Sequence, residues 1–577
     1  MTVDLKASPF LLDDQDIRWV EDTCRKMSVE EKVGQLFCVL FRSAEEDEIR
    51  DVYSILKPGG CMYRCVPMEK AVNIGNHLSQ VADIPLLIAA NLEKGGNGIV
   101  EEGTLVGSPM QVAATGDAGM AEKLGIVCAD EGVAVGANWT FAPIIDIDSN
   151  FRNPITNTRT FGSDPKIVRE MGVAYVKMVQ DHGMAATVKH FPGDGQDERD
   201  QHLVTSINDM DCETWDETYG RVYKACFDAG ALSCMIGHIM IPEYSRLLNP
   251  GIRDEDIMPA SLDAGLLNGL LRGQLGFNGL IITDATTMAG FTLPMSRKKA
   301  VPYSIACGCD MFLFARNLEE DVQFMMDGVS EGIITGTRLD EAVTRILATK
   351  AALGLHKTKL QYGQHKGNNA VSSIDLETAK STVGKKQHID WAEECADKSI
   401  TLVKEQPGVL PLTNGKYKKI LFHPVESVGG VSIYSVKEAC GAVAHKLRDE
   451  GFIVDMFEPS DGMEGKTPKT VETTEVYDLI LYVANLATKS NQTVVRIEWA
   501  QPMGANCGHY INDVPTVFVS LENPYHLLDF PRAKTFINCY SNNESTINAL
   551  IEKLCGRSEF KGISPVDPFC GKWDARL

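Results

Sequence analysis

The sequence lacks the features that mark membrane and nucleic-acid-binding proteins. No apolar run approaches the ~18 residues of a membrane-spanning helix. The N-terminus MTVDLKASPF has neither the basic start nor the continuous apolar stretch of a signal peptide. Basic residues form no stripe, and the formal net charge of -22 opposes binding to nucleic acid. We therefore expect no nucleic-acid partner and no membrane partner.

Motifs of cofactor and metal chemistry are missing as well. No GxGxxG or GxxxxGK[ST] string follows an apolar segment, and neither HExxH nor a Cys/His ligand spacing occurs. The 16 cysteines include no CxxC pair, and several lie in apolar runs such as residues 36–40 and 232–236. Buried free thiols indicate a reducing compartment, so we expect a cytoplasmic protein without a metal or cofactor.

What the sequence does contain is a series of short apolar segments separated by segments with helical periodicity. These eight apolar segments are Phe37–Leu40, Gly60–Tyr63, Pro85–Ala90, Trp139–Pro143, Ala185–Val188, Leu232–Ile236, Leu280–Thr283 and Asp310–Phe314. Continuous apolar strands that alternate with helices are typical of a parallel sheet covered on both faces. Eight of them predict a TIM-like (β/α)8 barrel, with an open doubly wound sheet as the alternative.

The chain of 577 residues is too long for one hydrophobic core. A polar stretch at 356–392 is followed by five further apolar segments at 419–422, 452–456, 478–483, 516–520 and 535–539. We predict a catalytic barrel over residues 1–355, a linker over 356–392, and a smaller doubly wound α/β sandwich domain over 393–577.

Polar side chains follow most of the barrel segments. They are Asn91 and Glu93 after the third, Arg159 in the loop after the fourth, Lys189 and His190 after the fifth, His238 after the sixth, Asp284 after the seventh and Arg316 after the eighth. In a barrel these positions share one face, where they would surround a polyhydroxylated ligand. Two alternatives stay open, because His238 could be a buried structural histidine and Arg316 could pair locally.

The stretch ATVKHFPGDGQDERDQHLVTSIN, residues 186–208, is the densest in polar groups. It ends an apolar strand and continues into a loop that contains Asp200 and His202. An Asp two residues before a His can orient the imidazole for proton transfer, although a solvated turn is the simpler alternative. We also expect residues 193–202 to be mobile, because their glycines and charges would not enter a core.

Asp284 occupies the end of an apolar strand in GFNGLIITDATTM. A strand end is a rigid position, which suits a carboxylate that acts as a nucleophile. The alternative is a helix N-cap, a role that Thr286 or Thr287 could fill instead.

The string KHFPGDG followed by RDQH resembles the KHFPGHG and DSH signature of glycoside hydrolase family 3, in its β-N-acetylhexosaminidase branch. MSVEEKVGQLF, NPITNTRTFGSDP and GFNGLIITDATTM are similar to other motifs of that family, and the resemblance runs from about Ile17 to the C-terminus. It implies an exo-acting retaining enzyme that hydrolyses terminal β-linked N-acetylhexosamine from an amino-sugar glycoside.

The resemblance also implies roles for single residues. Asp284 would form the covalent glycosyl-enzyme, His202 would be the acid/base, and Asp200 would hold the tautomer of His202. The residues that would bind sugar hydroxyls are Lys189, His190 and Arg159.

Two positions depart from the family pattern. Asn91 stands where the family has the Asp of DQEGGR, which contacts the sugar, and Asp194 stands where it usually has a second His. Asn91 keeps the shape but not the charge, so the identity of the hexosamine stays open. Two other functions also stay open, a β-N-acetylglucosaminide phosphorylase and a non-catalytic sugar-binding protein.

Overall fold

The computed structural model describes residues 3–357, 374–426, 438–457, 470–488, 490–500, 504 and 506–577. The chain forms two compact units. The first consists of Met1–Leu105, Ala121–Ile147 and Val168–His388, and the second of Val106–Met120, Asp148–Ile167 and Ile389–Leu577. Two segments of the N-terminal half thus belong to the second unit. The limits drawn from the sequence at 355 and 393 stay predictions.

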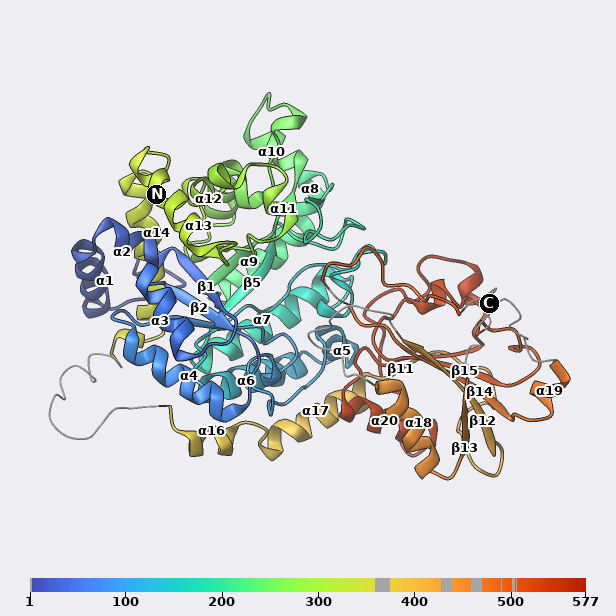
Figure 1. Ribbon diagram of the computed structural model, residues 1–577. Helices are drawn as coiled ribbons and strands as arrows, with labels where there is room; N and C mark the ends of the chain where they lie inside the picture. The colour runs from blue at the N-terminus through green and yellow to red at the C-terminus, as the bar shows by residue number, and fades with distance from the viewer. Residues whose placement is uncertain are drawn as a thin grey trace. The chain divides into compact units, whose positions relative to one another are not determined.

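The first unit is built on an eight-stranded parallel sheet that nearly closes into a barrel (Figure 1). Its strands are β1 (Phe37–Phe41), β2 (Gly60–Tyr63), β3 (Leu87–Ala90), β4 (Trp139–Thr140), β5 (Ala185–Phe191), β7 (Ser233–Ile236), β9 (Leu280–Thr283) and β10 (Phe312–Leu313). They are ordered β10-β1-β2-β3-β4-β5-β7-β9, and a parallel bridge between Ile282 and Met311 joins the two ends. Each of the eight apolar segments overlaps one strand, so the predicted barrel is confirmed.

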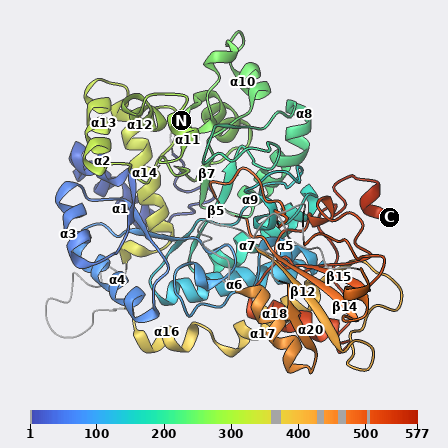
Figure 2. The same cartoon turned by 45° about the vertical axis from the view of Figure 1, so that its right-hand side comes forward.

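Helices alternate with these strands along the chain and cover the outside of the sheet (Figures 1 and 2). They are α1 (Asp14–Lys26), α2 (Val29–Gln35), α3 (Glu46–Ile55), α4 (Met68–Val81), α6 (Ala118–Ala134), α7 (Pro165–Asp181), α8 (Cys212–Trp215), α9 (Arg221–Asp228), α10 (Pro242–Leu248), α11 (Ala289–Thr292), α12 (Arg297–Ala306), α13 (Leu318–Ser330) and α14 (Gly336–Ala352). Two π-helical segments, η3 (Asp216–Gly220) and η6 (Gly265–Gln274), precede α9 and β9. Helical cover on the outside explains why the strands are mostly apolar.

Local signals set several of these boundaries. Helix α2 begins with a capping box, in which the Ser28 hydroxyl accepts from the Glu31 backbone N–H and the Glu31 carboxylate accepts from the Ser28 backbone N–H.

A small two-stranded sheet of β6 (Ser206–Ile207) and β8 (Ile239–Met240) lies beyond the carboxyl ends of β5 and β7 along the chain.

The second unit has a six-stranded sheet of order β11-β16-β15-β14-β12-β13. Its strands are β11 (Thr401–Lys404), β12 (Lys419–Glu426), β13 (Ile453–Met456), β14 (Leu479–Asn485), β15 (Thr516–Ser520) and β16 (Thr535–Asn538), and only the pairing of β11 with β16 is antiparallel. Alternate side chains enter two cores, with Leu479 and Leu481 in one and Ile480 and Tyr482 in the other. Both faces are therefore buried, as a doubly wound sheet requires.

Helices of the second unit include α5 (Pro109–Ala114), α18 (Ala439–Asp449), α19 (Thr470–Thr474) and α20 (Glu544–Leu554). The predicted linker at 356–392 lies partly outside the described residues. Its described part forms α16 (Leu376–Thr382) and the start of α17 (Lys386–Ser399). None of the described helices combines the length and the hydrophobicity needed to cross a bilayer. All sixteen cysteines are free, and most of them are buried.

Candidate active site

Asp284 directly follows β9, and both its backbone and its side chain are hydrogen-bonded. Its N–H donates to the Ile236 carbonyl at 2.8 Å, and its Oδ1 accepts from the Ala285 N–H at 2.7 Å. Burial opposes ionisation of this carboxyl group. Attraction to the imidazoles of His190, His238 and His202 outweighs that effect and lowers the pKa of Asp284 below its usual 3.8. Asp284 is thus an anion at neutral pH on a rigid element.

His190 lies within β5, which continues to Phe191, three residues beyond the strand end expected at Val188. Its Nδ1 donates to Asp146 Oδ2 at 2.7 Å and its backbone N–H donates to Asp146 Oδ1 at 3.0 Å. Asp146 Oδ1 also accepts from the Asp194 N–H at 2.8 Å. With Nδ1 committed to Asp146, His190 Nε2 is directed toward Asp284, 3.9 Å from Oδ2.

Asp146 is a site residue that sequence reasoning missed. It is completely buried and accepts three hydrogen bonds, so it fixes both the ring of His190 and the start of the loop that contains Asp194. Its position at the end of the apolar stretch FAPII was a signal that could have been used. The same reasoning singled out the other strand-end residues.

Lys189 and Glu93 form a buried ion pair with 2.9 Å between Nζ and Oε1. Glu93 lies three residues after β3, and Asn91 directly follows that strand and is half-buried. The pair therefore connects the carboxyl ends of β3 and β5. The pair fixes the position of the Lys189 ammonium group, and the two opposite charges largely cancel.

His202 and Asp200 form the dyad that the sequence indicated. His202 Nδ1 donates to Asp200 Oδ1 at 2.6 Å, and the His202 backbone N–H donates to the same oxygen at 2.9 Å. The Asp200 side chain is fully buried, whereas a quarter of the His202 side chain is exposed. The carboxylate thus sets the tautomer and leaves Nε2 for proton transfer.

The loop at 193–202 is anchored more firmly than we expected. Asp194, Asp200 and Gln201 are buried, the Tyr219 hydroxyl donates to the Asp194 carbonyl at 2.6 Å, and Gln201 Nε2 donates to Asp194 Oδ2 at 3.4 Å. The expectation that polar residues of this loop stay out of the core is wrong, because each finds a hydrogen-bond partner there. Mobility of the loop stays a prediction.

His238 is a buried structural histidine. Its Nε2 donates to the Ala285 carbonyl at 3.1 Å and its Nδ1 lies 2.9 Å from the Ser261 hydroxyl. Burial lowers its pKa from 6.5 to about 4, against the attraction of Asp284. It is therefore neutral at physiological pH and holds the backbone next to Asp284.

Two arginines named from the sequence have other surroundings. Arg159 ends η2 (Asn157–Arg159), which belongs to the second unit, and its Nη1 donates to the Ile155 carbonyl at 3.4 Å. Its sugar-binding role stays a prediction. The Arg316 backbone N–H donates to Asp321 Oδ2 at 2.8 Å, and the role of its guanidinium group stays a prediction.

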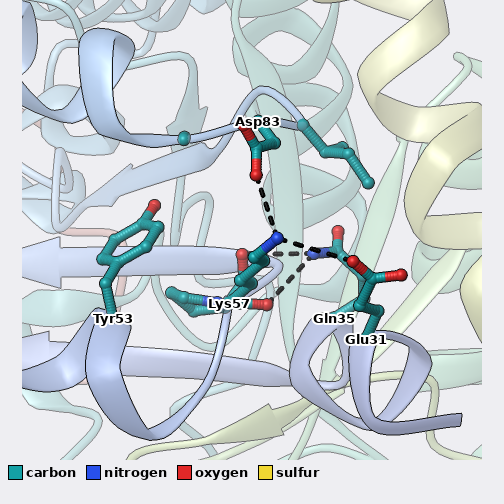
Figure 3. Close-up of a pocket in the computed structure, with 8 residues that line it drawn as sticks. Glu31, Gln35, Tyr53, Lys57 and Asp83 are labelled. Atoms are coloured by element: carbon teal, nitrogen blue, oxygen red, sulfur yellow. Dashed lines mark hydrogen bonds and ion pairs between the residues drawn. The ribbon is translucent and has the colours of Figure 1, made fainter. Parts of the chain in front are cut away.

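Charged residues also gather at the amino end of the barrel. Lys57 precedes β2, and its Nζ lies 2.9 Å from Asp83 and 3.5 Å from Glu31 beside a cavity of about 30 Å³ (Figure 3). That volume holds about one water molecule, so no sugar fits there. Within the described residues, no three His, Cys, Asp or Glu side chains are grouped as a metal site would require.

Comparisons with known proteins indicate the family of this chain. A family model described as "Glycosyl hydrolase family 3 N terminal domain" matches residues 28–349, more than half of the chain. A protein of Cellulomonas fimi named "Beta-N-acetylglucosaminidase/beta-glucosidase" is 49% identical over 578 residues and covers 100% of both chains.

Solved structures show the same two-domain fold. One described as "Beta-glucoside phosphorylase BglX" has a TM-score of 0.91 and 45% identity, covering 99% of each chain. A β-N-acetylglucosaminidase from Paenibacillus sp. str. FPU-7 has a TM-score of 0.76 at 24% identity, over 95% of this chain and 100% of that one. On the family match and the full-length relative together, this chain belongs to glycosyl hydrolase family 3.

Proposed function

We propose that the protein is a retaining, exo-acting enzyme that cleaves terminal β-linked sugars through a covalent intermediate on Asp284. The observation that carries this proposal is an ionised carboxylate at a strand end, among three imidazoles, in the same unit as the His202–Asp200 dyad. A retaining glycosidase needs a nucleophile and a proton donor of this kind.

The reaction has two steps. In the first, a carboxylate oxygen of Asp284 attacks the anomeric carbon, the glycosidic bond breaks, and His202 Nε2–H protonates the leaving oxygen. Asp200 holds Nδ1–H throughout and stabilises the imidazolium. In the second step neutral His202 removes a proton from the acceptor as it attacks the anomeric carbon, and the bond to Asp284 breaks. Two inversions give net retention.

The sugar is positioned by groups that the barrel already fixes. His190 Nε2 and the Lys189 ammonium group are donors for sugar hydroxyls, and Asn91 offers a neutral amide at the end of β3. Because Asn91 has no charge, it would hold a hydroxyl less tightly than an Asp does.

The substrate class proposed is a β-N-acetylglucosaminide, with β-glucosides as a second substrate. Its support is the printed name of the Cellulomonas fimi relative, which covers both sugars at 49% identity. The test is a side-by-side screen of nitrophenyl β-glycosides of N-acetylglucosamine, N-acetylgalactosamine and glucose, with Asp284→Asn as the inactive control. Faster turnover of N-acetylgalactosaminide than of the two gluco-configured substrates would contradict the proposal.

A second candidate keeps the sugar and the nucleophile but transfers the sugar to phosphate. It is favoured by the 45% identity over 99% of the chain to a structure described as a β-glucoside phosphorylase. The chemistry allows it, because His202 is neutral after the first step. A glutamate in that role would be anionic and would repel a phosphate dianion at short range.

Product analysis shows whether water or phosphate is the acceptor. The leaving group and the sugar would be quantified in phosphate-free buffer and again in millimolar phosphate. A hydrolase releases free sugar at the same rate in both buffers. Sugar 1-phosphate as the main product, with turnover that collapses without phosphate, would replace hydrolysis by phosphorolysis.

A non-catalytic sugar-binding protein would need neither Asp284 nor the dyad, so the alternative of a mere binder is disfavoured. We also infer a cytoplasmic location, supported by the free and mostly buried cysteines. Cell fractionation with activity assays tests that location.

A further inference from the structure

The loop that contains His202 is joined directly to α11, the helix that follows the nucleophile. The Ala289 N–H donates to the His202 carbonyl at 3.0 Å, and the Gly290 N–H donates to the Gln201 carbonyl at 3.2 Å. In return the Thr205 hydroxyl donates to the Gly290 carbonyl at 3.1 Å. Three hydrogen bonds thus connect the two loops within a few residues of His202.

The other end of this connection leads to Asp284. Helix α11 begins at Ala289, and the Met288 N–H donates to the Ala285 carbonyl at 3.1 Å, so the intervening chain is a tight turn. Asp284 itself is tied to β7 through the Ile236 carbonyl. The position of His202 relative to Asp284 is therefore set through a short path of hydrogen bonds.

Gly290 makes the close approach possible. A Cβ at this position would lie 2.6 Å from the Gln201 carbonyl oxygen, 2.9 Å from the His238 Cβ and 3.0 Å from the Val204 carbonyl oxygen. Two of these atoms belong to the backbone, so no rotamer change relieves the overlap. Any side chain here must push the 201–204 backbone away from α11.

His238 forms hydrogen bonds with both of the connected segments. Its N–H donates to Gln201 Oε1 at 2.7 Å, its carbonyl accepts from the Ser206 N–H at 3.3 Å, and its Nε2 donates to the Ala285 carbonyl. It therefore contacts both the loop of the acid/base and the residue after the nucleophile. His238 thus holds the loop both before His202, at Gln201, and after it, at Ser206.

We propose that the joint formed by Gly290, Thr205 and His238 positions His202 over the glycosidic oxygen, with Gly290 as its key positioning residue. The inference rests on the proposed acid/base role of His202. It predicts that moving α11 away from residues 201–204 impairs proton donation by His202. Nucleophilic attack by Asp284 should stay intact. Loss of activity should therefore depend on how much protonation the leaving group needs.

The test compares two β-glycosides of one sugar, one with a dinitrophenolate leaving group and one with an alkyl aglycone. The measured quantity is kcat/KM, which reports the first chemical step. For Gly290→Ala we expect a loss of about 100-fold on the alkyl glycoside, since general acid catalysis is worth roughly 10² to 10⁴. On the dinitrophenyl glycoside we expect a loss within about threefold, because this leaving group departs without a proton.

Gly336→Ala is the matched control, because a Cβ there meets no atom within 4 Å. It should leave both values unchanged. Thr205→Val is the second variant, since it removes only the hydroxyl and keeps the shape, so it folds even if Gly290→Ala does not. It should shift the ratio of the two kcat/KM values in the same direction by a smaller factor.

His202→Ala separates this inference from the proposed function. If His202→Ala leaves the ratio of the two substrates unchanged, the acid/base assignment itself is wrong. If His202→Ala shifts the ratio strongly but Gly290→Ala and Thr205→Val reduce both substrates equally or not at all, the joint does not position His202 and this inference is overturned.

Discussion

The two ends of the barrel both bury a carboxylate, but they surround it with different cations. At the amino end, Asp310 precedes β10 and accepts from Arg272 at 2.7 Å, Arg338 at 2.6 Å and Arg345 at 3.4 Å. At the carboxyl end, Asp284 lies among imidazoles. Burial opposes ionisation at both ends, and the neighbouring groups nevertheless lower both pKa values.

The difference lies in what the neighbours do with a proton. A guanidinium keeps its proton at any physiological pH, whereas an imidazole gains or loses one near neutrality. The cluster of Asp310 with its three arginines is thus a set of permanent charges that holds β9 and β10 together. We propose that the cluster around Asp284 serves proton transfer. Buried charge alone does not identify an active site, and the titratable neighbours are what favour Asp284.

The largest expected effect comes from removing the nucleophile. Asp284→Ala should reduce kcat by at least roughly 10⁴-fold, as loss of a nucleophile typically does. The fold should be retained, because the hydrogen bond that ties residue 284 to β7 comes from its backbone N–H and does not need the carboxylate. Steady-state kinetics and thermal unfolding of the same sample check both statements. Near-native activity would remove Asp284 from the mechanism.

The opposite pattern is expected at the amino end. Asp310→Asn leaves three buried guanidinium groups without their counter-charge, which should lower the free energy of unfolding by about 3 to 5 kcal/mol. Activity per folded molecule should stay within about twofold, because the cluster lies at the end of the barrel away from Asp284. Denaturant unfolding and active-site titration measure the two quantities. A stable but inactive Asp310→Asn enzyme would contradict the purely stabilising role of the Asp310 cluster.

A smaller effect follows from the lowered pKa of His238. Between its ordinary 6.5 and its folded value of about 4, the unfolded chain binds a proton that the folded chain does not. This contribution to stability is therefore present above pH 6.5 and falls as the pH is lowered, by about 2 kcal/mol at pH 5.

His238→Gln has no such titration and provides the control. Its unfolding midpoint in guanidinium should decline less than that of the wild type between pH 7 and pH 5. Equal declines for both proteins would show that His238 is not the neutral, buried group described above.

The smallest effect is expected for the surface charges at the amino end. Lys57 is half-exposed beside Asp83, and exposed ion pairs contribute about 0 to 1 kcal/mol. Lys57→Met should thus lower stability by less than about 1 kcal/mol, and less still in 1 M salt. A loss as large as that of Asp310→Asn would mean that the two clusters act alike.

Much of the barrel could be predicted because its strands are continuously apolar and short. Asp284 and the Asp200–His202 dyad could be named because each lies in one contiguous motif. Asp146 could not be tied to His190, since 44 residues separate them and only the closed barrel brings them together.

The sequence also could not show which segments make up the second unit. Gln111 donates to the Thr546 hydroxyl across 435 residues of sequence, and the Tyr525 hydroxyl donates to Asp148 across 377. Segments 106–120 and 148–167 belong to that unit through such long-range contacts. Periodicity and composition are local properties, so they could not reveal this.

The most direct test of the central claim is to trap the glycosyl-enzyme. The protein would be incubated with a 2-deoxy-2-fluoro-β-glucosyl fluoride, digested, and sequenced by mass spectrometry. We predict one fluoroglucosyl group per chain, attached to Asp284 in the peptide that contains GFNGLIITDATTM, and no adduct in Asp284→Asn. An adduct on another residue, or turnover of the reagent without any adduct, would contradict the account.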